Sequence, residues 1–147
     1  MQAFWRDLHA LADACIGPSQ WEPGAEGAPD VGPSSAAFVE RFQQRFGQVP
    51  DYPAAQAYAA GVILQRCVML AGTCIDADLR ASADGLTCRT FYGDFRLDPQ
   101  TGVQVGHEPV LVQWQGGEKK VVWPAEVAQV APVYSRRSSL PNPARGG

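Results

Sequence analysis

Residues 54–71 read AAQAYAAGVILQRCVMLA, an apolar run that decides the class of fold. The run is shorter than the roughly 20 apolar residues that cross a bilayer, and two glutamines and Arg66 interrupt it, so it predicts a buried helix rather than a membrane span. Pro53 suits the first turn of this helix, where a missing amide costs nothing, and Gly72 suits its end. Because a helix that is apolar on nearly every face must be packed on several sides, we expect other elements to surround it.

Further helices are predicted on both sides of this run. Residues 1–14 place apolar side chains at three- and four-residue steps, which is typical of an amphipathic helix. Ser34 or Ser35 can cap a second helix, which carries an aromatic stripe and ends at Gly47. A cap at Asp76 predicts a short helix that ends near residue 85, with apolar side chains facing inward.

Short strands are predicted before and after the helices. Residues 15–18 form a brief apolar segment that leads into a long Gly- and Pro-rich loop. From Thr90 onward apolar and polar residues alternate as far as a turn at 98–102. Residues 110–115 and 119–123 flank a Gly-Gly-Glu turn and predict a C-terminal hairpin. With 15 glycines and 12 prolines, the chain is expected to be a turn-rich α/β protein.

Length and charge limit the class of protein. A chain of 147 residues with 46% apolar residues and a net charge of -3 is sized for one ordinary soluble domain. No cluster of Lys and Arg is present, which excludes nucleic acid as a partner, since a nucleic-acid binder needs a basic face. The N-terminus lacks a basic start followed by an apolar stretch, so no signal peptide is predicted in this chain. Residues 131–147 are rich in Ser, Pro, Arg and Gly and predict a disordered tail.

The four cysteines do not have the spacing of a metal site. The chain contains no CxxC pair, so neither a metal nor another cofactor is expected. Cys67, inside the apolar run, is interpreted as a small buried hydrophobe. Cys74 and Cys88 flank the short predicted helix and could form a disulfide in an oxidising compartment, although with Cys15 the four cysteines allow three pairings.

No catalytic motif is present, and we predict that the protein is not an enzyme. His9 and His107 are interpreted as surface residues, because no motif pairs either of them with a nucleophile. Asp94 and Asp98 lie on one face of an extended segment with Arg96 between them. Paired carboxylates can perform acid–base chemistry, but a solvated face with a central counter-charge is the simpler interpretation.

The loop GPSQWEPG, residues 17–24, carries the residues best suited to a ligand. It follows a predicted strand, and in open α/β sheets ligands lie beyond the carboxyl ends of the strands. The indole of Trp21 beside the carboxylate of Glu22 could wall an apolar side chain and pair with an ammonium group. The alternative is that Trp21 only anchors the loop and lies on the surface of the domain.

Taken in order, these pieces resemble one family, the type I periplasmic solute-binding proteins of ABC importers, in the group that binds branched-chain amino acids. The resemblance covers about residues 4–130. It is carried by IGPSQWEP at 16–23, FVERFQQRFGQVP at 38–50, AAQAYAAG at 54–61, TFYGDFRLD at 90–98, VLVQW at 110–114 and VVWP at 121–124.

The resemblance implies a two-lobed clamp, in which open sheets flanked by helices hold a solute in the cleft between the lobes. Such proteins are much longer than this chain, so it is expected to be their C-terminal part, an incomplete clamp. Residues 1–22 would end one lobe, 34–115 would form the returning part of the other, and 119–130 would make the final crossing.

The resemblance also implies site residues, partners and a location. Trp21 and Glu22 would lie at the cleft mouth, and Tyr58 would lie near the hinge or cleft or else pack in the core. The partners would be an amino acid and an ABC permease or a complementing chain, and the incomplete lobe could also self-associate. Because the family is exported, a periplasmic or extracellular location is expected. The alternative functions are a ligand-sensing or protein-interaction module of the same fold, or a non-functional fragment.

Overall fold

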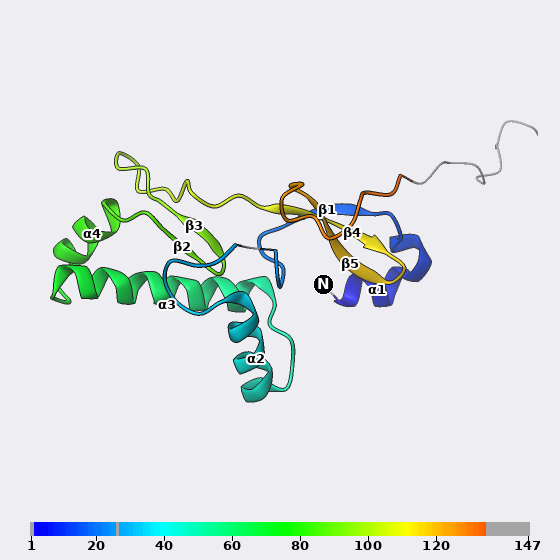
Figure 1. Ribbon diagram of the computed structural model, residues 1–147, viewed down its shortest axis with the longest axis horizontal. Coiled ribbons are helices and arrows are strands. Elements are labelled where there is room, and N and C mark those ends of the chain that lie inside the picture. Colours follow the sequence, from blue (N-terminus) through cyan, green and yellow to red (C-terminus); the bar gives the residue numbers. More distant parts are fainter. Residues whose placement is uncertain (1, 26, 135–147) are drawn as a thin grey trace, which may run out of the picture.

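The computed structural model describes residues 2–25 and 27–134, which form an elongated molecule with two parts (Figure 1). The sheet part consists of α1 (Gln2–Leu8), η1 (His9–Ala12), β1 (Ile16–Ser19), β4 (Val110–Gln115) and β5 (Glu118–Trp123). The helical part consists of α2 (Ser35–Phe46), α3 (Tyr52–Ala71), α4 (Asp76–Asp84), β2 (Cys88–Thr90) and β3 (Gly93–Phe95). The chain crosses between the parts twice, after β1 and again before β4 (Figure 1).

An antiparallel sheet in the order β1-β4-β5 forms the sheet part. Gly17 pairs with Val112 of β4, which pairs in turn with Val121 of β5. Gly116 and Gly117 join β4 to β5 with φ values of 60° and 88°, the left-handed conformations that a two-residue hairpin turn requires. The predicted C-terminal hairpin is therefore confirmed.

Two predictions for this part differ from the structure. Residues 1–14 do not form one helix, because α1 ends at Leu8 and the chain tightens into the 3₁₀ helix η1 at His9, where φ is 46°. Residues 34–115, expected to form the returning part of one lobe, do not all lie in the helical part, since β4 pairs with β1 and belongs to the sheet part. As the central strand, β4 satisfies its backbone groups on both edges, which it could not do beside the short hairpin β2–β3.

The ends of the two longer helices follow the local sequence. The Ser34 hydroxyl accepts a hydrogen bond from an amide of the first turn of α2 at 3.2 Å. Gly47 and Gly72 end α2 and α3 with φ values of 68° and 67°, as predicted. The cap predicted at Asp76 is wrong, because α4 already begins at Asp76 and Ile75 occupies the N-cap position without a side-chain hydrogen bond.

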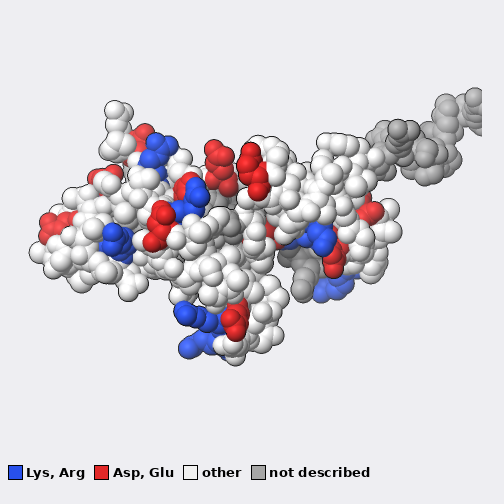
Figure 2. Space-filling model, viewed as in Figure 1, with Lys and Arg blue, Asp and Glu red and all other residues white. Residues whose placement is uncertain are grey.

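α3 is packed on one side rather than on several, so that prediction is wrong. Ala55, Ala59 and Cys67 are buried against α2, α4 and the hairpin β2–β3, whereas Leu64 and Met69 are 55% and 67% exposed. Figure 2 shows a largely uncharged surface over this helix. In the described part of the chain, α3 is also the one helix long and apolar enough to cross a membrane, a test that core helices of soluble proteins pass as well.

Three clusters of buried side chains form the core. The aromatic cluster lies where α2, α3 and the hairpin meet, the sheet cluster lies against β4 and β5, and the cysteine cluster joins α3 to β2. Because the aromatic cluster includes a residue of the segment after β1, it also connects the two parts. The buried members of the aromatic cluster are Trp21, Phe38, Ala55, Ala59 and Phe91. Those of the sheet cluster are Ala25, Val112 and Val121, and those of the cysteine cluster are Cys67, Leu86 and Cys88.

Candidate functional site

Trp21 is buried in the aromatic cluster. Its indole Nε1 donates a hydrogen bond to the backbone carbonyl of Phe91 at 3.1 Å. The indole also meets the rings of Phe38 and Phe91 edge-on, each at 6.0 Å between centroids. Trp21 therefore anchors the first crossing segment onto the helical part, but from the core and not from the surface of the domain, where the alternative placed it.

Glu22 is also buried, and its carboxylate is occupied. The Ser19 hydroxyl donates a hydrogen bond to one carboxylate oxygen at 2.6 Å, and the same oxygen forms an ion pair with Lys119 of β5. The pair fastens the loop after β1 to the far strand of the sheet. Glu22 therefore positions the crossing segment, and the structure gives its carboxylate two protein partners.

Tyr58 alone of the three predicted site residues reaches the surface, with 44% of its area exposed. Its ring packs on Phe38 and Phe91 at 5.1 and 5.8 Å between centroids. Tyr58 thus extends the aromatic cluster from the core to solvent. Together, Trp21 and Tyr58 contact the same two rings, so the structure brings these predicted residues into one cluster, with Glu22 one residue further along the chain.

A hollow of about 380 Å³ lies between α3, the hairpin β2–β3 and the segment before β4. This volume is within the roughly 300–1,000 Å³ range of small-molecule sites. The three predicted residues do not line it. Polar atoms come from Gln20, Gln56, Thr90, Asp94, Gln104 and His107, and apolar walls from Ala59, Ala60, Ile63, Tyr92 and Phe95.

His107 is half-buried on this hollow, so its interpretation as a surface residue is wrong. Its ring stacks on Tyr92 at 4.8 Å, and a Cβ at Gly93 would lie 2.6 Å from Nδ1, so only glycine fits there. Burial lowers the pKa of His107, opposed by a hydrogen bond with the backbone of Gln20 and by the charge of Asp94. Nε2 is buried without a hydrogen-bond partner in the described part of the chain.

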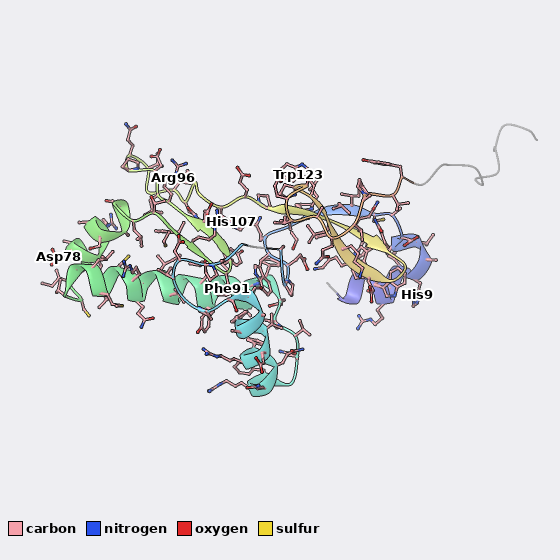
Figure 3. All side chains as sticks on the ribbon, viewed as in Figure 1. His9, Asp78, Phe91, Arg96, His107 and Trp123 are labelled. Carbon is pink, nitrogen blue, oxygen red and sulfur yellow. The ribbon has the colours of Figure 1, made fainter. Side chains whose placement is uncertain are left out.

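The sequence offers only a weak signal for this histidine. His107 lies beside the hairpin near Phe91, whereas His9 lies in the sheet part (Figure 3). The turn predicted at 98–102 does return the chain toward Tyr92, and Leu97 bridges to Gln104 across it. The pairing of Leu97 with Gln104 decides which residue faces Tyr92 after the turn. The alternation of apolar and polar residues along one segment does not predict this pairing.

Asp94 and Asp98 serve different contacts. Arg89 of β2 donates two hydrogen bonds to Asp94, at 2.6 and 3.1 Å, and thereby lowers the pKa of this carboxyl. Arg89 is therefore the counter-charge of Asp94, and the prediction that Arg96 has this role is wrong. Arg89 lies directly opposite Asp94 in the hairpin, and side chains of such cross-strand pairs lie closer together than those two residues apart on one strand. Asp98 accepts hydrogen bonds from the turn residue Thr101, which lower its pKa.

The cysteines are free thiols in this structure. Cys74 is exposed and Cys88 is buried, and a bridge between them in an oxidising compartment stays a prediction. Burial raises the pKa of both Cys67 and Cys88, which keeps these thiols protonated and unreactive at neutral pH. Cys67 is thus a small buried hydrophobe, as predicted. In the described residues, no group of three or more His, Cys, Asp or Glu side chains is placed to hold a metal.

The chain thus has two mixed helix-and-sheet parts joined by two crossing segments. A sequence model of the periplasmic binding protein family matches residues 1–119, and the chain belongs to this family. The family consists of solute-binding proteins. No curated protein sequence matches the chain.

Solved structures share the fold. A protein assigned to a branched-chain amino acid ABC transporter of Rhodospirillum rubrum is similar over 83% of this chain and 34% of its own, with 21% identity and a TM-score of 0.65. A periplasmic binding protein from Burkholderia mallei is similar over 86% of this chain and 35% of its own, with 18% identity and a TM-score of 0.64. A leucine-binding protein from Thermotoga maritima is similar over 82% of this chain and 33% of its own, with 15% identity and a TM-score of 0.61. The chain thus spans about a third of the length of these proteins, and the predicted partial type I periplasmic binding fold is confirmed.

Proposed function

We propose that the chain is part of the solute-binding component of an ABC uptake system and that its solutes are branched-chain amino acids. The family match over residues 1–119 carries this proposal. The titles of two similar structures, which name a branched-chain amino acid transporter and a leucine-binding protein, support the choice of solute. The protein would bind and deliver its solute in the periplasm, with a membrane permease as the receiving partner.

The proposed site extends from Tyr58 to the crossing segment. Tyr58 supplies an exposed aromatic face that suits an aliphatic side chain. Trp21 and Glu22 act by positioning this segment, Trp21 through the aromatic cluster and Glu22 through Lys119. The hollow beside them adds hydrogen-bonding groups at Gln20, which suit the polar end of an amino acid.

Thermal unfolding of the chain with single amino acids tests this function. Leucine, isoleucine and valine should raise the melting temperature, because a ligand at a hundred times its Kd adds about 2.7 kcal/mol to stability. Aspartate and lysine, which are not among the proposed solutes, should leave it unchanged. Tyr58→Ala should reduce the shift, while Tyr52→Ala, at another exposed position on α3, should retain it. A melt that responds to no amino acid, or equally to leucine and aspartate, would contradict the proposal.

A protein-interaction module of the same fold is the second candidate function. The observation that favours it is the surface of α3, where Leu64 and Met69 are exposed and few side chains are charged (Figure 2). Such a surface marks a binding site for another protein more often than a free surface. Under this function the chain would form a complex with another polypeptide and its melt would not respond to branched-chain amino acids.

A further inference from the structure

The hollow between α3 and the hairpin β2–β3 has more polar groups than the proposed function uses. That function uses only Gln20, which follows β1 on the first crossing segment. Three residues of α3 line the hollow at steps of four and three residues, which places them on one side of the helix, and two residues of β3 line it as well. We define the inner hollow by these five residues, Gln56, Ala60, Ile63, Asp94 and Phe95.

Tyr58 lies on a different side of α3 from the inner hollow. Residues two apart in an α-helix point roughly 160° away from each other, so Ala60 points nearly opposite to Tyr58. Ala55 and Ala59 lie between these two directions and are buried in the aromatic cluster. The inner hollow is therefore a site separate from the exposed face of Tyr58.

The charges around the inner hollow favour a cation over an anion. Asp94 is ionised at neutral pH, because Arg89 lowers the pKa of its carboxyl. Among the described residues that line the hollow, Asp94 is the one charged group at neutral pH and none is Lys or Arg. His107 adds no positive charge there, because burial lowers its pKa.

Asp94 keeps the capacity to accept further hydrogen bonds. Arg89 donates one hydrogen bond to Oδ1 and one to Oδ2, and each carboxylate oxygen can accept about two. The side chain of Asp94 is 47% exposed, so a small molecule can reach it. Gln56 is also exposed, and its side chain makes no hydrogen bond with other described residues.

We propose that the inner hollow binds a small aliphatic amine, with the ammonium group on Asp94 and Gln56 and the hydrocarbon chain against Ala60, Ile63 and Phe95. An ammonium group donates three hydrogen bonds, and those to a carboxylate are among the stronger ones in proteins. The volume of about 380 Å³ is ample for an amine of a few carbon atoms.

Other small ligands fit the inner hollow less well. A carboxylic acid would place its charge beside Asp94 without a cationic side chain in the lining, and an amino acid would do the same with its carboxylate. A metal ion such as Ca²⁺ needs several oxygen ligands, whereas Asp94 is the one carboxylate among the lining residues that the structure describes. The proposal thus does not rest on the proposed function, which concerns amino acids.

Isothermal titration calorimetry of the full chain at neutral pH tests the proposal, with 3-methylbutylamine as the probe. The amine should bind, whereas isovalerate, which has the same hydrocarbon chain and a carboxylate, should not. Asp94→Asn should weaken amine binding by about tenfold or more, because it removes the charge that the ammonium group contacts. Arg89→Gln is the matched control, since it breaks the same exposed ion pair but keeps that charge, and it should bind the amine at least as tightly as the wild type.

A second pair of variants tests the place of binding. Ala60→Leu should weaken amine binding by about tenfold or more, because the larger side chain fills the inner hollow. Ala81→Leu, at an exposed alanine of α4 outside the hollow, should bind like the wild type. All four variants should keep the circular dichroism and melting temperature of the wild type, because the four positions are exposed.

Four results would overturn the proposal. These are a wild-type chain that binds no amine, equal binding of isovalerate, amine binding that Asp94→Asn or Ala60→Leu leaves unchanged, and a loss of binding in Arg89→Gln as large as in Asp94→Asn. A chain that binds the amine as expected but is not stabilised by leucine, isoleucine or valine would support the inner hollow and reject only the proposed function.

Discussion

At the residue scale, Trp21 connects the first crossing segment to the helical part. Trp21→Ala should lower the free energy of unfolding by about 3–5 kcal/mol, because it removes a large buried side chain. Trp21→Phe should cost about 1–3 kcal/mol, since it keeps much of the packing but leaves the Phe91 carbonyl without its donor. Urea unfolding measures both, with the exposed Trp123→Ala as control. Equal stability of Trp21→Ala and Trp123→Ala would contradict the assignment.

His107 gives the second prediction at this scale, a dependence of stability on pH. Because burial lowers its pKa in the folded protein below the ordinary value of 6.5, the unfolded chain binds the proton more readily. The contribution of neutral His107 is therefore fully present above pH 6.5 and is lost as the pH falls through the folded pKa. Between about pH 7.5 and about pH 5.5, wild type should lose more unfolding free energy in urea titrations than His107→Gln.

The control for this pH experiment is His9→Gln, which removes the exposed histidine of η1. It should lose as much free energy as the wild type over the same interval. If His107→Gln shows the same loss as the wild type, the half-buried ring does not carry the pH dependence.

At the scale of the elements, two glycines should respond to alanine in opposite directions. Gly47 ends α2 at a φ of 68°, a conformation that alanine adopts only with strain, so Gly47→Ala should destabilise the protein by about 1 kcal/mol. Gly61 lies inside α3 with open space around its Cβ position, so Gly61→Ala should stabilise the isolated chain by about 0.5–1 kcal/mol. Thermal or urea unfolding measures both, and changes of the same sign would contradict the helix boundaries.

At the scale of the whole molecule, the pair of Glu22 and Lys119 fastens the crossing segment to β5. Glu22→Gln should destabilise the protein by about 1–3 kcal/mol, because the pair is largely shielded from solvent and Ser19 also donates to this carboxylate. A double-mutant cycle with Lys119→Met should give a coupling of at least about 0.5 kcal/mol in urea unfolding. Strict additivity of the two substitutions would show that the pair does not join the two regions.

Some features of the molecule depend on neighbours along the chain, and these the sequence predicts well. Ser34 caps α2 and Gly47 and Gly72 end their helices, since capping needs only residues within one turn. The Gly116–Gly117 turn similarly predicts its own hairpin, because both glycines adopt the left-handed conformation. The family resemblance, which depends on the order of such local pieces, is confirmed by the match over residues 1–119.

The candidate site depends on contacts between distant segments, which only the tertiary structure decides. Trp21 and Glu22 are neighbours in one predicted loop, but their contacts lie in different parts of the molecule. Trp21 contacts Phe91 of the helical part, whereas Glu22 pairs with Lys119 of the sheet part. His107 reaches Tyr92 through a register that alternation does not encode. The sequence by itself therefore determined the ends of α2 and α3, the C-terminal hairpin and the family, because local conformational preferences and order along the chain suffice for these. Only the tertiary structure decided which side chains are buried, paired or open to a partner, because burial is a property of the surroundings that folding assembles.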